Sequence, residues 1–196
     1  MKKHTLLWAM LGIIAVIVLW AIGANNKMIT KEENATSKWG NVQADYQRRK
    51  DLVEQAINIV KGAGNYESST LENVIRARNN APQLDANDLT EENIAKFQAA
   101  YDKMAQEMTR AINVTVERYP ELTATKNYQD FQAQVEGCEN RINVSRKAFN
   151  DAVRDYNTTI RRFPNSIIAG MFGHDKMGYF QASEGADQAP STEALL

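Results

Sequence analysis

Two histidines and one cysteine are the side chains of this 196-residue sequence best suited to binding a metal or acting as nucleophiles. A zinc site needs three or four His, Cys or carboxylate ligands brought together. His4 stands beside a long apolar run and His174 near the other end, and neither has another His or a Cys close to it. Cys138 is alone, which excludes an intrachain disulfide. We therefore expect no metal, no cofactor and no catalytic residue.

Motifs and composition argue against other chemistry. The sequence has no G-x-S-x-G, no H-E-x-x-H, no Gly-rich phosphate loop and no paired-Cys motif. Its 23 Lys and Arg residues nearly balance 24 Asp and Glu residues, whereas a nucleic-acid-binding domain usually carries a basic face. We expect that the chain is not an enzyme, and that it takes neither nucleic acid nor a small-molecule substrate.

Three asparagines form the first polar feature that could bind a partner protein or a second copy of the chain. Asn143, Asn150 and Asn157 recur every seven residues, so on a straight helix they drift by only about 20° per heptad and share one flank. Arg146 and Arg154 lie three or four residues from members of this line. Either the amides border the core and bridge to neighbouring helices, or this flank is a surface for a partner or a second copy, with polar groups that fix the register.

Arg49 is the second such feature, because it interrupts an otherwise apolar helix seam. A buried guanidinium needs a carboxylate or water. Glu136 or Glu139 of the last long helix could pair with it. We expect an internal ion pair, with ligand binding as the alternative.

The first element that must be placed is an apolar run at the N-terminus. As a helix, Leu6 to Ala24 would be about 28 Å long, close to the roughly 30 Å of a bilayer core. Trp8 and Trp20 lie near its ends, where indole rings favour the interface. A cleaved signal peptide is the alternative, but the run exceeds the roughly 7–15 residues of its usual apolar region. We expect residues 1–27 to remain as a transmembrane anchor, with a slight basic bias placing the following domain outside the cytoplasm.

Residues 28–165 are expected to form an elongated antiparallel bundle of three to four helices, so the fold class is all-α. A short helix over 71–78 and a loop over 79–88 link the first long helix to the second, for which Thr90 is a plausible N-cap. The last helix is expected to run from about Asn127 to Phe163. The seam positions are Ala35, Trp39, Val42, Tyr46, Arg49, Val53, Ala56 and Val60; then Ile94, Phe97, Tyr101, Met104, Met108, Ala111 and Thr115; and finally a bulky line of Val135, Ile142, Phe149, Tyr156 and Phe163 beside a smaller line of Phe131, Cys138, Ser145, Ala152 and Thr159.

An apolar segment, residues 166–182, follows the proline that ends the last helix. Since that helix must run back toward the membrane, we expect the apolar side chains of this segment to contact the membrane interface. Tyr179 and Phe180 would extend the contact, and Gly170 and Gly173 would let the backbone turn. The alternatives are that the segment caps the bundle or fills a groove of another subunit. Residues 183–196 are small and polar and are expected to be disordered. The interface candidates are Ile167, Ile168, Met171 and Phe172.

An ordered series of motifs resembles the LemA family. They are "QRRKDLVEQAINIVKG" (47–62), "LENVIRARNNA" (71–81), "ERYPELTA" (117–124), "ENRINVSRKAFNDAVRDYNTTIRRFP" (139–164), "SIIAGMFG" (166–173) and "YF" (179–180). Where family members typically have Pro and Asn-Leu after "DLI", this chain has Glu54, Gln55 and Ala56, so its first helix should continue without a proline.

The resemblance implies a membrane-anchored helical protein of bacteria and provides no catalytic residue. We therefore expect an interaction or assembly protein of the bacterial inner membrane, with its domain in the periplasm and the cytoplasmic side as the alternative. The expected partners are the lipid membrane and either further copies of the chain or other membrane proteins. An envelope sensing or signalling module that binds a ligand or partner protein is the alternative function.

Overall fold

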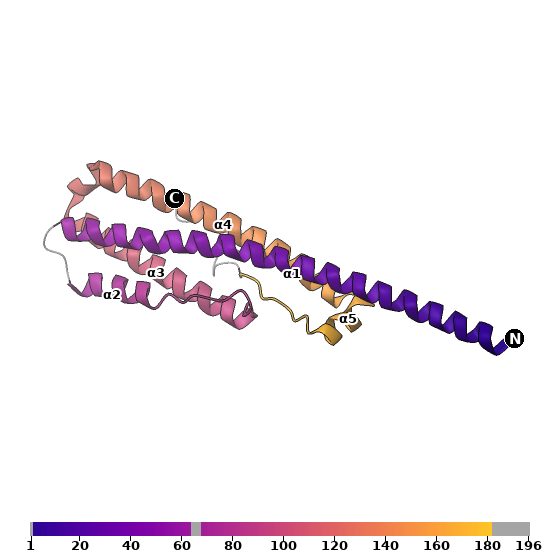
Figure 1. The fold of residues 1–196 in the computed structure, drawn as a ribbon. Helices are drawn as coiled ribbons and strands as arrows, with labels where there is room; N and C mark the ends of the chain where they lie inside the picture. The colour runs from indigo at the N-terminus through magenta and orange to yellow at the C-terminus, as the bar shows by residue number, and fades with distance from the viewer. Residues whose placement is uncertain (1, 64–67, 182–196) are drawn as a thin grey trace, which may run out of the picture.

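The structure, a computed structural model, describes residues 2–63 and 68–181 of the chain, and these are all-α (Figure 1). No strand occurs among the described residues. A long apolar helix at the N-terminus continues into a helical bundle, as predicted. The elements are α1 (Lys2–Gly62), α2 (Ser68–Asn79), α3 (Glu91–Arg118), the 3₁₀ helix η1 (Pro120–Ala124), α4 (Lys126–Arg161) and α5 (Asn165–Phe172).

Helix α1 joins the apolar N-terminal run to the bundle without a break (Figure 1). Its 61 residues correspond to roughly 90 Å of helix. Apolar side chains are exposed from Leu6 to Ile22, and the buried seam begins at Ala24 and Met28. The expected boundary between residues 27 and 28 therefore falls inside one continuous helix.

The bundle core lies between α1, α3 and α4, and its centre is aromatic. The Trp39 ring centroid is 5.1 Å from that of Phe97 and 5.4 Å from that of Phe149. Tyr46 packs edge-on against Tyr101 at 4.7 Å. Every seam position predicted for α1 and α3 is buried. The Thr90 hydroxyl accepts a hydrogen bond from the Asn93 backbone N–H at 3.2 Å, which confirms the predicted N-cap.

Helix α4 runs back along α1 toward the apolar end. Phe149 meets Trp39, and further along α4 Tyr156 and Ile160 share a buried cluster with Ala24 and Met28 of α1. The predicted direction of the chain is therefore correct.

The end of α4 differs from the prediction. Helix α4 ends at Arg161, and Phe163, expected on the bulky seam line, is 82% exposed. Ile160 takes the buried position instead, together with Val153 and Asn157, which the seven-residue lines did not include. The reason is that α4 ends before this position, with Arg162 as its C-cap, so Phe163 lies outside the helix, whereas Ile142, Phe149 and Tyr156 of the same line stay buried.

Candidate functional site

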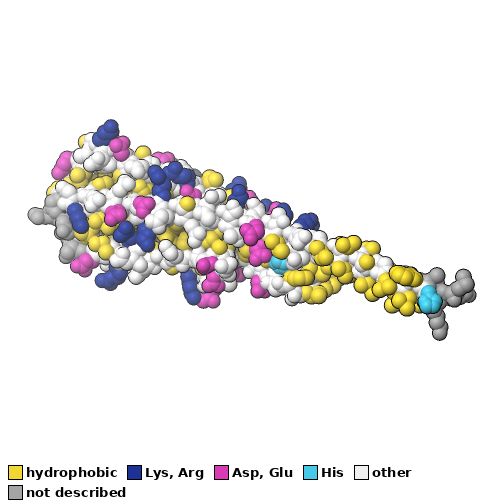
Figure 2. Space-filling model, in the orientation of Figure 1, with side chains coloured by type: hydrophobic (Ala, Val, Ile, Leu, Met, Phe, Trp, Pro, Cys, Tyr) yellow, Lys and Arg dark blue, Asp and Glu magenta, His cyan; other side chains and the backbone are white. Residues whose placement is uncertain are grey.

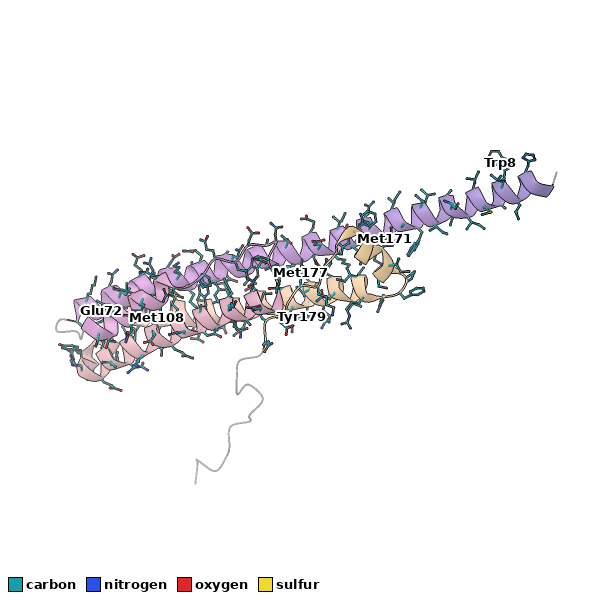
Figure 3. The ribbon with its side chains drawn as sticks, turned by 90° about the horizontal axis from the view of Figure 1, so that it is seen from below. Trp8, Glu72, Met108, Met171, Met177 and Tyr179 are labelled. Atoms are coloured by element: carbon teal, nitrogen blue, oxygen red, sulfur yellow. The ribbon has the colours of Figure 1, made fainter. Side chains whose placement is uncertain are left out.

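The part of the chain after α4 carries the features that could serve function, and it begins with α5. This helix lies against α1 where the exposed apolar run ends (Figures 1 and 3). Ile168 and Ala169 are buried in the cluster with Ala24 and Met28 of α1. Ile168 is therefore packed in the protein rather than available to lipid, which corrects one of the four interface candidates.

The opposite face of α5 is apolar and exposed. Figure 2 shows hydrophobic side chains continuing from the N-terminal apolar run onto the adjacent end of the bundle. Helix α5 ends at Gly173, whose φ of 74° is left-handed and suits a glycine, whereas Gly170 lies inside the helix and makes no turn. The exposed apolar side chains here are Phe163, Ile167, Met171 and Phe172, which we call the junction face.

His174 ties the end of α5 to α1. Its side chain is buried, with Nδ1 3.1 Å from Glu32 Oε2 and Nε2 3.0 Å from Asn25 Oδ1. Its ring also meets Tyr156 edge-on at 6.4 Å. Sequence reasoning treated this histidine as isolated, because Glu32 and Asn25 are about 140 to 150 residues away along the chain.

Beyond α5 the chain is extended and returns along the bundle, where side-chain amides hold its backbone. Asn157 donates to the Met177 carbonyl at 2.8 Å and accepts from the Met177 N–H at 3.1 Å. Asn150 does the same with Phe180, at 2.9 Å for both bonds. Seven helical residues rise roughly 10.5 Å and three extended residues about 10 Å, so the heptad spacing of the asparagines matches every third residue of the segment.

A third amide and a glycine complete this attachment. Gln98 of α3 exchanges both hydrogen bonds with the Gln181 backbone, at 3.2 and 3.3 Å. The Gly178 N–H donates to the Leu89 carbonyl at 2.8 Å. A Cβ on Gly178 would lie 2.5 Å from Glu91 Cα, so no larger residue fits without moving backbone. We call residues 174–181 the return segment.

The return segment changes the interpretation of several candidates. Asn150 and Asn157 bridge to another part of their own chain, and that part is the return segment rather than a neighbouring helix. Phe180 is buried among the core aromatics, so it does not extend a membrane contact. Tyr179 is partly exposed, and its hydroxyl accepts a hydrogen bond from Asn157 at 3.1 Å.

The remaining members of the candidate interaction surface differ in accessibility. Asn143 is exposed on α4. Arg154 is exposed and pairs with Asp151 of the same helix at 2.9 Å. Arg146 is mostly buried and faces the core network described below. Of the five candidates, Asn143 and Arg154 keep side chains on the surface, and their role in association stays a prediction.

Replacing Asn150 by leucine is expected to loosen the return segment. The Phe180 N–H and C=O would lose both partners, and unpaired buried backbone groups are costly, so the free energy of unfolding should fall by about 1–2 kcal/mol. Asn143→Leu is the matched control, since it lies one heptad away on the same helix but is exposed, and its effect should stay within about 0.5 kcal/mol. Thermal melts and hydrogen exchange at 177–181 measure both. Equal effects of the two variants would contradict this role of Asn150.

Arg49 lies at the centre of a buried charge network. Its side chain is 5% exposed, and its Nη2 forms an ion pair and hydrogen bond with Glu139. Its Nη1 is 3.6 Å from Asp102 Oδ1, and Asp102 also receives a hydrogen bond from Arg146 Nη2 at 3.2 Å. The network thus balances two guanidinium groups with two carboxylates contributed by α3 and α4. Glu139 is a predicted partner of Arg49, Asp102 was not foreseen, and Glu136 is exposed.

Tyr46 packs between the two guanidinium groups. The Arg49 and Arg146 Cζ atoms lie 5.3 and 5.4 Å from its ring centroid, and Arg146 Nε donates to its hydroxyl at 2.6 Å. Burial raises the pKa of Tyr46 to about 12, against the opposing effect of the nearby Arg146 and Arg49 charges. The phenol therefore stays protonated at neutral pH and serves as a structural acceptor.

Two comparisons with known proteins bear on this architecture. The sequence profile of the LemA family matches residues 38–193, which is most of the chain. The chain belongs to the LemA family. A protein LemA of Metamycoplasma hominis is 23% identical to it over 171 residues, which cover 87% of this chain and 75% of that protein.

In this LemA-family chain the matched region begins after the apolar run and includes most of the bundle, the junction face and the return segment. Among the described residues, one helix is long and apolar enough to cross a membrane; it is α1, near the N-terminus, and its most apolar stretch is unburied, with mean hydropathy 2.6. The chain is thus compatible with a single-pass membrane anchor.

Two observations bear on the chemistry of the described part of this LemA-family chain. Within residues 2–63 and 68–181, no three His, Cys, Asp or Glu side chains are grouped so as to hold a metal ion. Cys138 is buried, its thiol lies 3.7 Å from the Asp45 carbonyl, and burial raises its pKa, so it is a poor nucleophile.

An open groove of about 1050 Å³ runs between α3 and α4 beyond the return segment. Its lining includes Arg49, Asp102 and Glu139 of the charge network, together with Gln98 and Gln181. The Nε and Nη1 atoms of Arg49 are buried there without a hydrogen-bond partner among the described residues. This groove gives the ligand-binding alternative a physical basis.

Proposed function

We propose that this chain is a non-catalytic, membrane-anchored interaction and assembly protein of the bacterial envelope. Residues 1–27 remain as a single-pass anchor in the inner membrane, and the domain stands on the extracytoplasmic side. One observation carries the proposal: the bundle is built on the same helix that forms the apolar run, and α5 holds an exposed apolar face at the level where that run ends.

In this proposal the junction face lies in the membrane interface. Ile168 and Ala169 fix α5 to α1, so the exposed residues project beside the apolar run rather than from a free loop. Burying a side chain of this size contributes roughly 1.5–3 kcal/mol when burial is complete. A second contact beside the anchor would hold the bundle at a defined tilt to the membrane.

Single cysteines at Met171 and Phe172, in a Cys138→Ala background, test this position. Each would carry a polarity-sensitive fluorophore in the full chain reconstituted in vesicles. Lipids with quenching groups on their acyl chains should quench both labels, because the junction face reaches the acyl boundary. A label at Lys103, exposed on α3 far from the anchor, should not be quenched. A folded, anchored protein whose labels on α5 escape quenching would exclude the membrane contact.

A surface formed by α1 and α4 is the proposed site of self-association between copies of the chain. Val144 is 70% exposed there, in a shallow and largely apolar depression of about 380 Å³. Its walls include Ala148 from α4 and both Lys38 and Asp45 from α1, so charges of both signs border an apolar centre. Copies anchored in one membrane would meet side by side along this surface.

Replacing Val144 by aspartate should reduce crosslinked oligomers of the membrane-bound chain by several-fold, because a carboxylate would be desolvated at the centre of the contact. Asn143→Asp, next to it, is expected to have a smaller effect. Glu136→Gln, on a different part of α4, is the control. Unchanged crosslinking in Val144→Asp, with the helical content retained, would remove this surface from the proposal.

A sensing or signalling module that binds a ligand or partner protein is the second candidate function. The groove between α3 and α4 favours it, since Arg49 lines this groove and two of its nitrogen atoms have no hydrogen-bond partner among the described residues. A ligand that raises the melting temperature of the wild-type chain, and not of Arg49→Leu, would support this alternative.

A further inference from the structure

Three basic side chains lie at the level where α1 leaves its apolar run. Lys27 is exposed on α1, Arg161 is the last residue of α4, and Arg162 caps that helix. Their level is fixed by packing, because Ile160, next to Arg161, shares a buried cluster with Ala24 and Met28 of α1. Within residues 2–63 and 68–181, none of the three basic residues forms an ion pair.

The carboxylates of this region lie farther from the apolar run, and two of them are already engaged. Asp155 pairs with Lys31 at 3.4 Å, and Glu32 contacts His174. Along α1, Glu32 follows Lys27 by five residues, or about 7.5 Å of helix. Charge is therefore separated along the axis, with basic groups nearer the apolar run and carboxylates farther away. Glu33 lies beside Glu32 on α1, and Asp175 and Lys176, which are adjacent, exposed and opposite in sign, cancel each other.

A structural role for the two arginines accounts for part of this pattern. Basic side chains at a helix C-terminus interact favourably with the helix dipole. This explains Arg161 and Arg162, but not Lys27, which lies inside α1 where the helix continues for many turns. It also does not explain why the chain next exposes Phe163 and the apolar face of α5.

We infer that Lys27, Arg161 and Arg162 form a binding site for the phosphate headgroups of anionic lipids. Guanidinium groups bind phosphate oxygens through paired N–H donors, and an ammonium group adds a point charge. The junction face beside them would contact the acyl chains of the same lipids, so this site rests on the membrane contact proposed above. The ligand class is a phospholipid with a net negative headgroup, taken from the surrounding membrane.

The test compares two lipids at one labelled position. The full chain with Cys138→Ala and Met171→Cys carries the fluorophore in vesicles of equal parts phosphatidylcholine and phosphatidylglycerol. In one arm the quenching groups are on the phosphatidylglycerol chains, and in the other on the phosphatidylcholine chains. Each basic residue near the surface favours anionic lipid by about 1 kcal/mol, or about fivefold, so three of them should enrich phosphatidylglycerol around the label by at least about fivefold.

Two triple variants distinguish a specific lipid site from a general effect of net charge. Lys27→Gln, Arg161→Gln and Arg162→Gln together should bring the ratio of the two quenching signals to one, while leaving both signals present. Lys103→Gln, Arg110→Gln and Lys126→Gln together remove the same charge from exposed positions farther from the anchor and should leave the preference intact. Inorganic phosphate should weaken the preference no more than sodium chloride of equal ionic strength.

Each result has a distinct meaning. Equal quenching by both lipids in the wild-type sequence would overturn this inference and leave the membrane contact of α5 standing. A preference lost equally in both triple variants would also overturn it, because net charge alone would then explain the effect. Absence of quenching by either lipid would overturn the membrane contact and this site with it.

Discussion

Replacing Asp102 by asparagine is expected to lower the free energy of unfolding by about 2–4 kcal/mol. The change removes the carboxylate that faces both Arg49 and Arg146, whose side chains are only 5% and 13% exposed. Of the two carboxylates, only Glu139 would then remain, and it pairs with Arg49 alone. Breaking a fully buried pair costs about 3–5 kcal/mol, and we expect less because Asp102 is 36% exposed and reaches solvent.

The companion variants show whether the network acts as described. Arg49→Leu should cost less than Asp102→Asn, because it removes a buried charge and leaves carboxylates that water can solvate. Glu139→Gln should fall between them, and the exposed Glu136→Gln should change the free energy of unfolding by less than about 0.5 kcal/mol. Thermal and denaturant melts of the full chain in detergent provide the comparison. If Arg49→Leu proves the most damaging, the guanidinium stabilises the fold by packing rather than through its partners.

Replacing Gly178 by alanine is expected to detach the return segment from α3 at a cost of about 2–4 kcal/mol. The new Cβ would lie 2.5 Å from Glu91 Cα and 2.8 Å from the Thr90 carbonyl carbon, and backbone atoms cannot rotate away as a side-chain tip can. Moving the segment also breaks the hydrogen bond from the Gly178 N–H to Leu89. Faster hydrogen exchange should therefore appear at the start of α3 and at 176–181.

Gly170→Ala is the matched control for that variant. A Cβ at Gly170 meets open space, and the residue lies inside α5, where alanine favours the helix by up to about 1 kcal/mol. It should leave the melting temperature unchanged or raise it. Similar behaviour of the two alanine variants would mean that the return segment is not packed against α3 as the structure has it.

Much of the bundle could be predicted from the sequence, because its helices are amphipathic and their apolar spacing reports burial directly. The seams of α1 and α3 and the N-cap at Thr90 are examples. The end of α4 is an exception, because the helix stops at Arg161 and leaves Phe163 exposed, so Ile160 is the last buried residue of α4. The expected disorder of residues 183–196 concerns a part of the chain outside the described residues.

The contacts of the return segment could not be predicted, since extended segments held by side chains leave no periodic signal. The heptad of asparagines was visible, but its partner is backbone, and any residue type presents the same N–H and C=O groups. The same limit applies to Asp102, which lies on α3 one position beyond a seam residue and looks like a solvated acid in sequence. His174 and Phe180 likewise gain their roles only from chain reversal after α5.

With the apolar run in a bilayer, as proposed, the unbroken α1 fixes both the height and the rotation of the bundle relative to the membrane. From Ala24 to Gly62 the helix rises about 57 Å, which limits how far from the membrane surface the tip of the bundle can act. Each residue also turns the helix by about 100°, so the azimuth of every side chain in the apolar run is locked to the azimuth of the bundle faces. When the helix of a neighbouring membrane protein packs against one side of the apolar run, the soluble part of that protein therefore contacts one particular face of the domain.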